Sequence, residues 1–195
     1  MMRVLGRSVV AVVVLTLVLG FVYPLLFTGF AQLAFAGKAN GSLVERDGKV
    51  VGSKLAAQAF TKPEYFHPRP SATVPEYNAG ATTFANWGPT STDLAKEVRQ
   101  RIAAILKLER PYNPGLTVGD IPVDAVTTSG SGIDPHISPA NAHLQAARIA
   151  KVRGLTMERV DQLIDDNTDG RWLGIFGEPG VNVLELNLAL DKERA

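Results

Sequence analysis

The first 37 residues of the chain are almost uncharged, and hydrophobic side chains dominate them. No charged residue lies between Ser8 and Gly37, an uncharged run of 30 residues. A helix needs about 20 apolar residues to cross the hydrocarbon core of a bilayer. Because lipid offers the backbone no hydrogen-bond partners, such a run must be helical. The pattern therefore predicts one transmembrane helix over residues 9–36, with a kink at Pro24, which lacks an amide donor.

The charges at the two ends of this helix predict its orientation. Arg3 and Arg7 precede it, whereas Lys38 is the only charge close behind it. Cytoplasmic flanks are the ones rich in Lys and Arg, so we expect residues 1–8 in the cytoplasm and residues 37–195 as an extracytoplasmic domain. The alternative is a cleaved signal peptide, because Ala34-Phe35-Ala36 resembles a cleavage site. A signal peptide has a hydrophobic segment of only about 7–15 residues, so we favour a retained anchor.

Beyond residue 37, short periodic segments alternate with loops rich in proline and glycine. Residues 43–51 predict a β-hairpin, because Asp-Gly within them supplies the positive φ angles of a two-residue turn. Residues 61–91 combine Pro, Gly, Thr and Asn with aromatic side chains, which is typical of an ordered loop rather than a flexible linker. A short strand is predicted over residues 123–127. A half-buried strand is predicted over residues 183–191, where leucine occupies every second position from Leu184.

Three helices are predicted in the same region, each after a residue that can cap its first turn. They are residues 92–107 after Thr90 or Thr92, residues 139–152 after Ser138, and a further helix after Thr156. Gly154 is placed to end the second of these in the left-handed conformation. Helices and strands without a regular βαβ alternation indicate an α+β class. We expect a single N-terminal transmembrane helix followed by one extracytoplasmic mixed α/β domain.

Charge and cysteine content exclude several classes of function. Outside the N-terminal helix, 18 Lys and Arg face 19 Asp and Glu. Nucleic-acid binding needs clustered basic residues, so this near balance argues against it. Cysteine is absent, which excludes disulfides and thiolate metal sites. The chain also lacks the G-x-x-x-x-G-K-[ST] loop of common nucleotide hydrolases.

The densest polar stretch is the loop at residues 127–139. It contains Ser129, Ser131, Asp134 and His136, so a hydrolase must be considered. The stretch lacks the G-x-S-x-G arrangement of a nucleophile elbow, and catalytic triads are assembled from separated segments rather than from neighbouring residues. We therefore predict an ordered loop that presents a protein-binding surface.

The histidines offer the other candidate chemistry. His67, His136 and His143 are the only three, and together with Asp134 they include the types of side chain that bind metal. The Cys and Glu partners of common metal sites are missing, so we predict structural or interfacial roles for them. Glu178 lies in a glycine-rich turn, and we expect it to be solvated or paired with an arginine.

A set of motifs occurs in a fixed order along most of the chain. They are the N-terminal helix, residues 62–66 with 69–72, Asn86 with residues 88–90, residues 129–139, Gln145 with Arg148, residues 153–155, residues 177–179, and residues 181–184 with 186–191. Taken together rather than singly, these motifs resemble the C-subunit family of Kdp-type potassium-transporting ATPases, KdpC. The chain departs from the family pattern in two places: residues 80–85, where the family has a segment rich in Gly and Ser, and Gly180, where arginine is common.

The resemblance implies a non-catalytic accessory subunit of an ATP-driven, high-affinity potassium uptake complex in the inner (plasma) membrane. Its implied partners are a channel-like potassium-translocating subunit, a P-type ATPase subunit, a small single-helix subunit and membrane lipid. ATP, Mg and K would be used by the complex, with no cofactor, metal or catalytic residue on this chain. The implied role is assembly and stabilisation, control of potassium access, or an increase in the ATP affinity of the pump subunit.

The interface candidates are residues of ordered polar loops and an exposed aromatic, because such groups are common in protein interfaces. They are Asn86, Trp87, Ser129, Ser131, Asp134, His136 and Glu178. Two other functions stay open from the residues alone. One is a membrane-anchored periplasmic hydrolase that uses Ser129 or Ser131 with His136. The other is an anchored cation-binding protein that uses loop carbonyls and Asp134.

Overall fold

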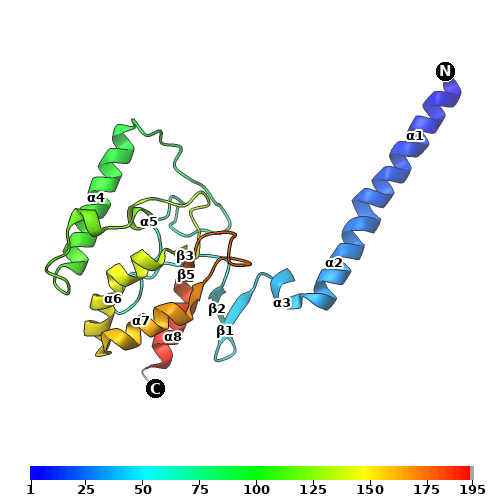
Figure 1. Cartoon of the computed structure of the whole chain (residues 1–195). Coiled ribbons are helices and arrows are strands. Elements are labelled where there is room, and N and C mark those ends of the chain that lie inside the picture. Colours follow the sequence, from blue (N-terminus) through cyan, green and yellow to red (C-terminus); the bar gives the residue numbers. More distant parts are fainter. Residues whose placement is uncertain (194–195) are drawn as a thin grey trace. The chain divides into compact units, whose positions relative to one another are not determined.

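The structure, a computed structural model, describes residues 1–193 and divides the chain into two compact units (Figure 1). The first unit comprises residues 1–43, and the second begins at Val44. A long apolar helix is therefore followed by a domain of helices and small antiparallel sheets, as the sequence predicts.

The first unit is built around one long helix. It consists of α1 (Met2–Leu17), a π-helical turn (Val18–Val22) and α2 (Tyr23–Ala34), and the short α3 (Ala36–Ala39) follows. None of the side chains in the long helix is buried. Among residues 1–193 it is the one helix long and apolar enough to cross a membrane. It begins at Met2, so most of the predicted segment 1–8 is helical as well.

The π-helical turn lies directly before Pro24, which occupies the first turn of α2. The backbone N–H of Tyr23 donates to the carbonyl of Val18, five residues back. A proline ring clashes with the carbonyl four residues before it and supplies no donor, and wider turns of this kind are a known cause of helix bending. The irregularity expected at Pro24 therefore takes the form of a local widening of the helix.

The second unit contains two small sheets. The predicted hairpin is confirmed as β1 (Leu43–Arg46) and β2 (Lys49–Ser53). The other sheet has the order β3–β5–β4, and β5 (Gly180–Asn182) pairs antiparallel with both β3 (His136–Ile137) and β4 (Thr168–Asp169). The helices are α4 (Thr92–Glu109), α5 (Val123–Val126), α6 (Pro139–Arg153), α7 (Met157–Asp166) and α8 (Val183–Lys192), with a 3₁₀ turn at Val118–Asp120.

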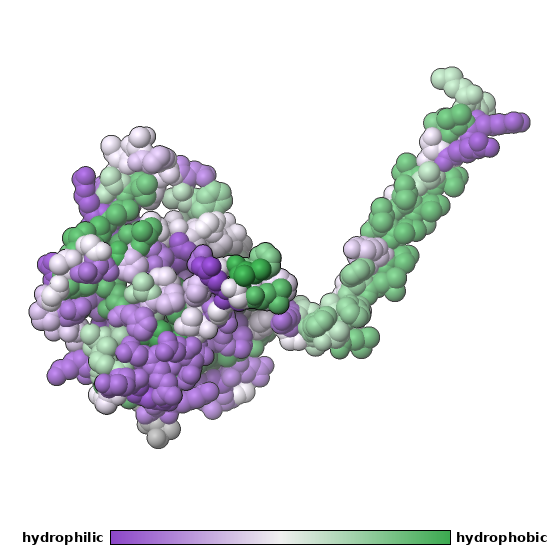
Figure 2. All heavy atoms as spheres, in the orientation of Figure 1, coloured by the Kyte–Doolittle hydropathy of each residue, from purple (hydrophilic) through white to green (hydrophobic). Residues whose placement is uncertain are grey.

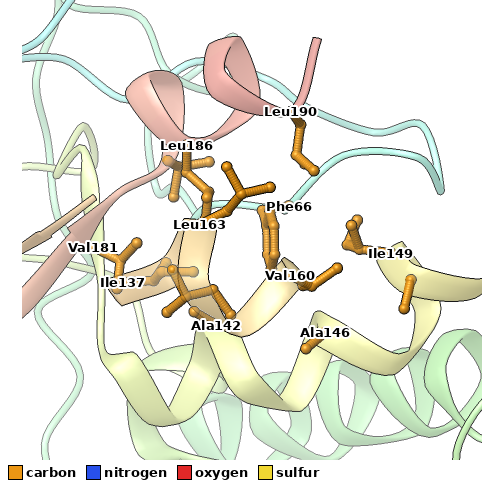
Figure 3. Close-up of a cluster of buried hydrophobic side chains, with 13 residues drawn as sticks. Phe66, Ile137, Ala142, Ala146, Ile149, Val160, Leu163, Val181, Leu186 and Leu190 are labelled. Atoms are coloured by element: carbon orange, nitrogen blue, oxygen red, sulfur yellow. The ribbon is translucent and has the colours of Figure 1, made fainter. Parts of the chain in front are cut away.

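The core of this unit lies between α6, α7, α8 and the three-stranded sheet (Figure 3). Phe66, from the long loop before α4, has no exposed surface and lies among side chains of α6 and α8. Its partners in the cluster include Ala146, Val160 and Leu186, which are also fully buried. Complete burial of a large apolar side chain stabilises the folded state by about 1.5–3 kcal/mol. One loop residue therefore joins three helices into a single core.

Polar side chains hold the loop around Phe66 in its extended path. Asn187 of α8 accepts from the Phe66 N–H at 2.9 Å and donates to its carbonyl at 2.9 Å. Gln145 of α6 makes the same pair of bonds with the backbone of His67, at 2.8 and 3.1 Å. A buried backbone group without a partner is strongly unfavourable, so these amides make an irregular loop possible inside the core.

Two strand predictions are wrong. Residues 183–191 form helix α8, in which Val183, Leu186 and Leu190 are buried at helical spacing. Asn182 caps this helix by accepting from the Glu185 N–H at 3.2 Å. The leucine alternation imitated a strand, but Leu, Ala and Glu favour helix. Residues 123–127, the other predicted strand, instead contain the short helix α5.

The three predicted helices are confirmed, but one of them is capped by a different residue than expected. Ser138 and Thr156 cap α6 and α7 as expected, and Gly154 ends α6 with a φ of 70°. The cap of α4 is Ser91, which accepts from the Leu94 N–H at 3.3 Å, rather than Thr90 or Thr92.

Candidate functional site

The polar loop before α6 is folded tightly around Gly132. This glycine has a φ of 72°, and a Cβ atom there would lie 2.7 Å from the Thr83 carbonyl oxygen and 2.9 Å from Thr73 Cγ2. The carbonyl of Gly132 accepts from Ser71 Oγ at 2.7 Å, and its N–H donates to Ser129 Oγ at 2.9 Å. Only glycine fits a left-handed position approached this closely by another backbone. The loop is therefore ordered, as predicted.

Asp134 and His136 form a charged cluster at the end of this loop. Asp134 accepts from the His136 N–H at 3.0 Å and from Arg69 Nη1 at 3.1 Å. His136 Nε2 lies 3.3 Å from Asp169 Oδ2. The side-chain hydrogen bond with Asp134 raises the pKa of His136, and it lowers the pKa of Asp134 below its ordinary value. The cluster thus favours a charged imidazole between carboxylates.

Asp124 fixes the start of α6 beside this cluster. Its carboxylate accepts from the N–H and the Oγ of Ser138, both at 2.8 Å, and from Asn141 Nδ2 at 3.0 Å. Negative charge at a helix N-terminus is favourable, because the unpaired amides there carry partial positive charge. The aspartate therefore ties the short helix α5 to the helix that follows the polar loop.

A hollow of about 440 Å³ lies over these residues. Asp134, His136 and Glu178, three of the interface candidates, line it. Glu178 pairs with Arg171 at 2.8 Å, which agrees with the expectation that it is paired with an arginine. The residues that line the hollow are Arg69, Asp124, Asp134, His136, Ile137, Ser138, Asp169, Glu178, Pro179 and Gly180.

The other interface candidates have different positions. Ser129 is buried and Ser131 accepts from the Ile133 N–H at 3.2 Å, so both serve the internal order of the loop. Asn86 and Trp87 lie on an exposed stretch before α4, outside the lining of the hollow. The structure therefore gathers the acidic and histidine candidates and leaves Asn86 and Trp87 apart from them.

Sequence reasoning missed Arg69, Asp124 and Asp169 as members of this site. Asp169 is 33 residues from His136 in the sequence. Its place in the site depends on the strand order β3–β5–β4, which brings Asp169 opposite Gly180 and His136 opposite Asn182. Two-residue strands give no periodic signal, so no local pattern could have indicated this pairing.

The geometry of the loop gives little support to a hydrolase. In the described part of the chain, the hydrogen bonds of Ser129 Oγ join it to the Gly132 N–H and to Ser131 Oγ, not to an imidazole. Both ring nitrogens of His136 face carboxylates, Nδ1 at 3.7 Å from Asp134 and Nε2 at 3.3 Å from Asp169. A nucleophilic serine needs a base within hydrogen-bond reach, and this histidine is turned elsewhere.

The three histidines are separated by their contacts. His67 Nε2 bonds to the Lys62 carbonyl, His136 lies in the charged cluster, and His143 Nδ1 lies 3.1 Å from Asp161. Within residues 1–193, no group of three or more His, Asp or Glu side chains is arranged to hold a metal ion.

Several residues of the recognised motifs hold the domain together. Arg148, fully buried, pairs with Glu109 at 2.8 Å and donates to the carbonyls of Pro63 and Tyr65. Arg153 donates to the Glu64 carbonyl at 2.8 Å and lies 4.8 Å from the centre of the Tyr65 ring. These motif residues thus hold the loop at residues 61–71 in place, and the role of their side chains is structural.

The comparison with known proteins decides the family. The model of the KdpC family, described as the c chain of the K+-transporting ATPase, matches residues 5–192. The chain belongs to the KdpC family. It is similar to the potassium-transporting ATPase KdpC subunit of Rhodospirillum rubrum, with 51% identity over 192 residues, covering 98% of this chain and 97% of the relative.

Two further KdpC subunits show the same extent of similarity. The one from Methylococcus capsulatus is 50% identical and covers 96% of both chains. The one from Mycobacterium tuberculosis strain H37Rv is 48% identical and covers 98% of this chain and 100% of the relative. This KdpC-family chain is therefore a subunit of a potassium-transporting ATPase complex in a membrane, and the other Kdp subunits are its partners.

Proposed function

We propose that the chain is the non-catalytic accessory subunit of an ATP-driven, high-affinity potassium uptake complex in the inner (plasma) membrane. It assembles and stabilises a channel-like potassium-translocating subunit, a P-type ATPase subunit and a small single-helix subunit. ATP, Mg and K are used by the complex, and this chain carries no cofactor of its own. Residues 1–8 face the cytoplasm, residues 9–36 cross the bilayer, and residues 37–195 lie outside.

The observation that carries this proposal is the long helix Met2–Ala34 in a chain of the KdpC family. Its 33 residues include no buried side chain, so its apolar surface needs lipid or other helices as a partner. At a rise of about 1.5 Å per residue it is long enough for the hydrocarbon core, which is about 30 Å thick. Arg3 and Arg7 at its start support a cytoplasmic N-terminus.

The non-catalytic role is supported by the use of the motif residues. Arg148 and Gln145 hold the loop at residues 61–71, and Gly132 orders the polar loop. The exposed groups that remain, in the hollow around Asp134 and His136, suit recognition of another protein, since ordered polar groups set specificity in interfaces. Both oxygens of Asp134 are already engaged, by His136 and Arg69, which disfavours this carboxylate as a cation ligand.

Purification of the complex with and without this chain tests the proposal. We expect the complete complex in proteoliposomes to take up potassium when ATP is supplied, and the complex lacking this chain to fall apart or to lose uptake. Normal uptake without the chain would overturn the proposal. A chain that does not co-purify with a channel-like subunit and a P-type ATPase subunit would do so as well.

Two finer roles can be separated by kinetics on the same preparations. If the chain controls potassium access, its variants change the potassium concentration that gives the half-maximal ATPase rate. The ATP concentration that gives the half-maximal rate then stays unchanged. If it increases the ATP affinity of the pump subunit, the reverse change is observed. Glu178→Gln, which alters the hollow without touching the core, is the first variant for this comparison.

A further inference from the structure

The loop between β4 and β5 ends in an apolar tip that the fold does not cover. The tip consists of Trp172, Leu173, Ile175 and Phe176, which are 69%, 71%, 70% and 56% exposed. Figure 2 shows a strongly hydrophobic patch where this loop, orange to red in Figure 1, reaches the surface. Exposed apolar groups in such a cluster mark sites of contact with proteins or membranes.

The backbone of the apolar tip is paired internally. The N–H of Trp172 donates to the Phe176 carbonyl at 2.8 Å, and the N–H of Phe176 donates back to the Trp172 carbonyl at 3.0 Å. The N–H groups of Gly174 and Ile175 donate to carbonyls of residues 171 and 172. A segment that leaves water must satisfy its backbone groups internally, and this turn meets that requirement.

Leu173 has an unusual backbone conformation at the apolar tip. Its φ is 52°, a left-handed conformation that is strained for a leucine and ordinary for glycine or asparagine. Strained residues of this kind cluster at functional sites. Here the strained residue exposes an aliphatic side chain at the end of the turn. Arg171 and Glu178, paired at 2.8 Å, form the polar base of the loop.

The base of this loop lies close to the hairpin that begins the second unit. A hairpin places the start of β1 beside the end of β2. Just after β2, the carbonyl of Lys54 accepts from Asn182 Nδ2 at 2.9 Å, and Asn182 is two residues beyond Gly180, where the loop ends. Leu55, next to Lys54, is also exposed, at 62%.

The tether to the membrane is short. Residues 35–43 separate the long helix from the second unit, and fully extended they would span about 30 Å. Helix α3 shortens this further, because a helix rises only about 1.5 Å per residue. The start of the domain is therefore tethered within about 30 Å of the end of the long helix.

We propose that the apolar tip inserts into the interface of the bilayer leaflet next to the domain and holds the domain against the membrane. Trp favours this depth, because its amphipathic ring suits the boundary between headgroups and acyl chains, and Phe is common on the apolar side of segments that lie there. Leu and Ile add apolar area that is removed from water. The inference rests on the proposed function for the single membrane span, and it adds a second, reversible membrane contact.

The two tryptophans of the chain make a direct test possible. Trp87→Phe leaves Trp172 as the only tryptophan, and Trp172→Phe leaves Trp87. Each full-length variant is reconstituted in phosphatidylcholine vesicles with and without brominated acyl chains, which quench only tryptophans in contact with lipid. We expect blue-shifted emission and strong loss of intensity for Trp172, and neither change for Trp87. Emission of Trp172 typical of water, without quenching by bromine, would overturn the proposal.

A second measurement keeps the test valid if Trp87→Phe disturbs folding. The chain contains no cysteine, so Ile175→Cys can carry one polarity-sensitive dye, with Val123→Cys as the control because Val123 is 74% exposed. We expect the dye at residue 175 to shift to the blue on reconstitution and the dye at residue 123 to stay unchanged. Equal emission from both positions would contradict insertion.

The same probes separate this inference from the proposed function. A chain that co-purifies with the other subunits but shows no lipid contact at Trp172 overturns only the insertion. A chain with bromine quenching that fails to co-purify overturns only the accessory role. Shielding of Trp172 in the whole complex without bromine quenching would identify a protein as the partner of the apolar tip, and would also overturn the proposal.

Discussion

Arg148 shows at the scale of single residues how the domain uses charge. Its side chain has no exposed surface, and its guanidinium bonds to Glu109, to Gln145 and to two backbone carbonyls. Burial raises the pKa of Glu109, and the charge and hydrogen bond of Arg148 oppose this rise. Removal of one partner from a buried pair leaves the other charge without compensation, and such changes are strongly destabilising.

Arg148→Met is therefore expected to lower the free energy of unfolding by about 3–5 kcal/mol. Arg159→Met is the matched control, because Arg159 pairs with Glu193 on the surface, where ion pairs contribute about 0–1 kcal/mol. Urea unfolding of the full chain in mild detergent measures both. A loss of similar size in the two variants would contradict the role given to Arg148.

His136 gives the domain a dependence on pH. Its pKa is raised above 6.5, first by the hydrogen bond with Asp134 and further by Asp169. A group with a raised folded-state pKa contributes stability that is fully present below its unfolded pKa and is lost as pH rises through the folded pKa. We therefore expect His136→Gln to destabilise the chain more at about pH 5.5 than at about pH 8.5.

His67 is a control of opposite sign for this measurement. Burial lowers its pKa below 6.5, so its contribution is present at high pH and is lost as pH falls. His67→Gln should therefore be more harmful at the higher pH. Thermal unfolding of both variants and the unchanged chain at the two pH values checks the pair. The same sign of pH dependence in both variants would refute the electrostatic account of His136.

At the scale of elements, specific close contacts fix the irregular loop before α6. The polar loop before α6 depends on Gly132, whereas Gly130, two residues earlier, has open space around it. Gly132→Ala forces a methyl group against the Thr83 carbonyl in a left-handed conformation, which alone costs about 1–2 kcal/mol. We expect destabilisation of at least that size.

Gly130→Ala is the matched control for this loop, because an added Cβ there meets no atom within 4 Å. We expect its unfolding midpoint to stay close to that of the unchanged chain. Urea unfolding followed by circular dichroism compares the two variants. A harmless Gly132→Ala would show that the loop is less tightly packed than the structure indicates.

Sequence patterns predicted elements best where local signals were strong. The caps Ser138 and Thr156 and the Asp-Gly turn of the hairpin gave correct elements, because each rests on neighbouring residues. The alternating leucines of α8 misled, because Leu186 and Leu190 in this pattern are also four residues apart and so lie on one face of a helix. Asn182 followed three residues later by Glu185 is a pattern typical of a helix start, and it indicates the helix that the structure shows here.

The candidate site could be predicted only in part, for a physical reason. Asp134 and His136 were recognised because they share one loop with its glycines. Arg69, Asp124 and Asp169 come from other segments, and their place depends on two-residue strands and on the packing of the core. Such long-range contacts leave no local pattern in the sequence.

At the scale of the whole molecule, the proposed function requires the long helix to lie in lipid and the domain to lie outside the cytoplasm. The helix Met2–Ala34 has no buried side chains, and the domain from Val44 onward has a core of its own. The Lys and Arg distribution around the helix predicts which side the domain occupies. The accessory role and the membrane contact of the apolar tip both depend on this orientation.

Cysteine labelling in intact cells tests this orientation most directly, because the chain contains no cysteine of its own. Val123→Cys places one exposed thiol on the domain, and Val4→Cys places one before the membrane span. The proposed orientation predicts that a membrane-impermeant maleimide labels residue 123 in intact cells and residue 4 only after the membrane is permeabilised. Labelling of residue 4 in intact cells, with residue 123 protected until permeabilisation, would contradict it.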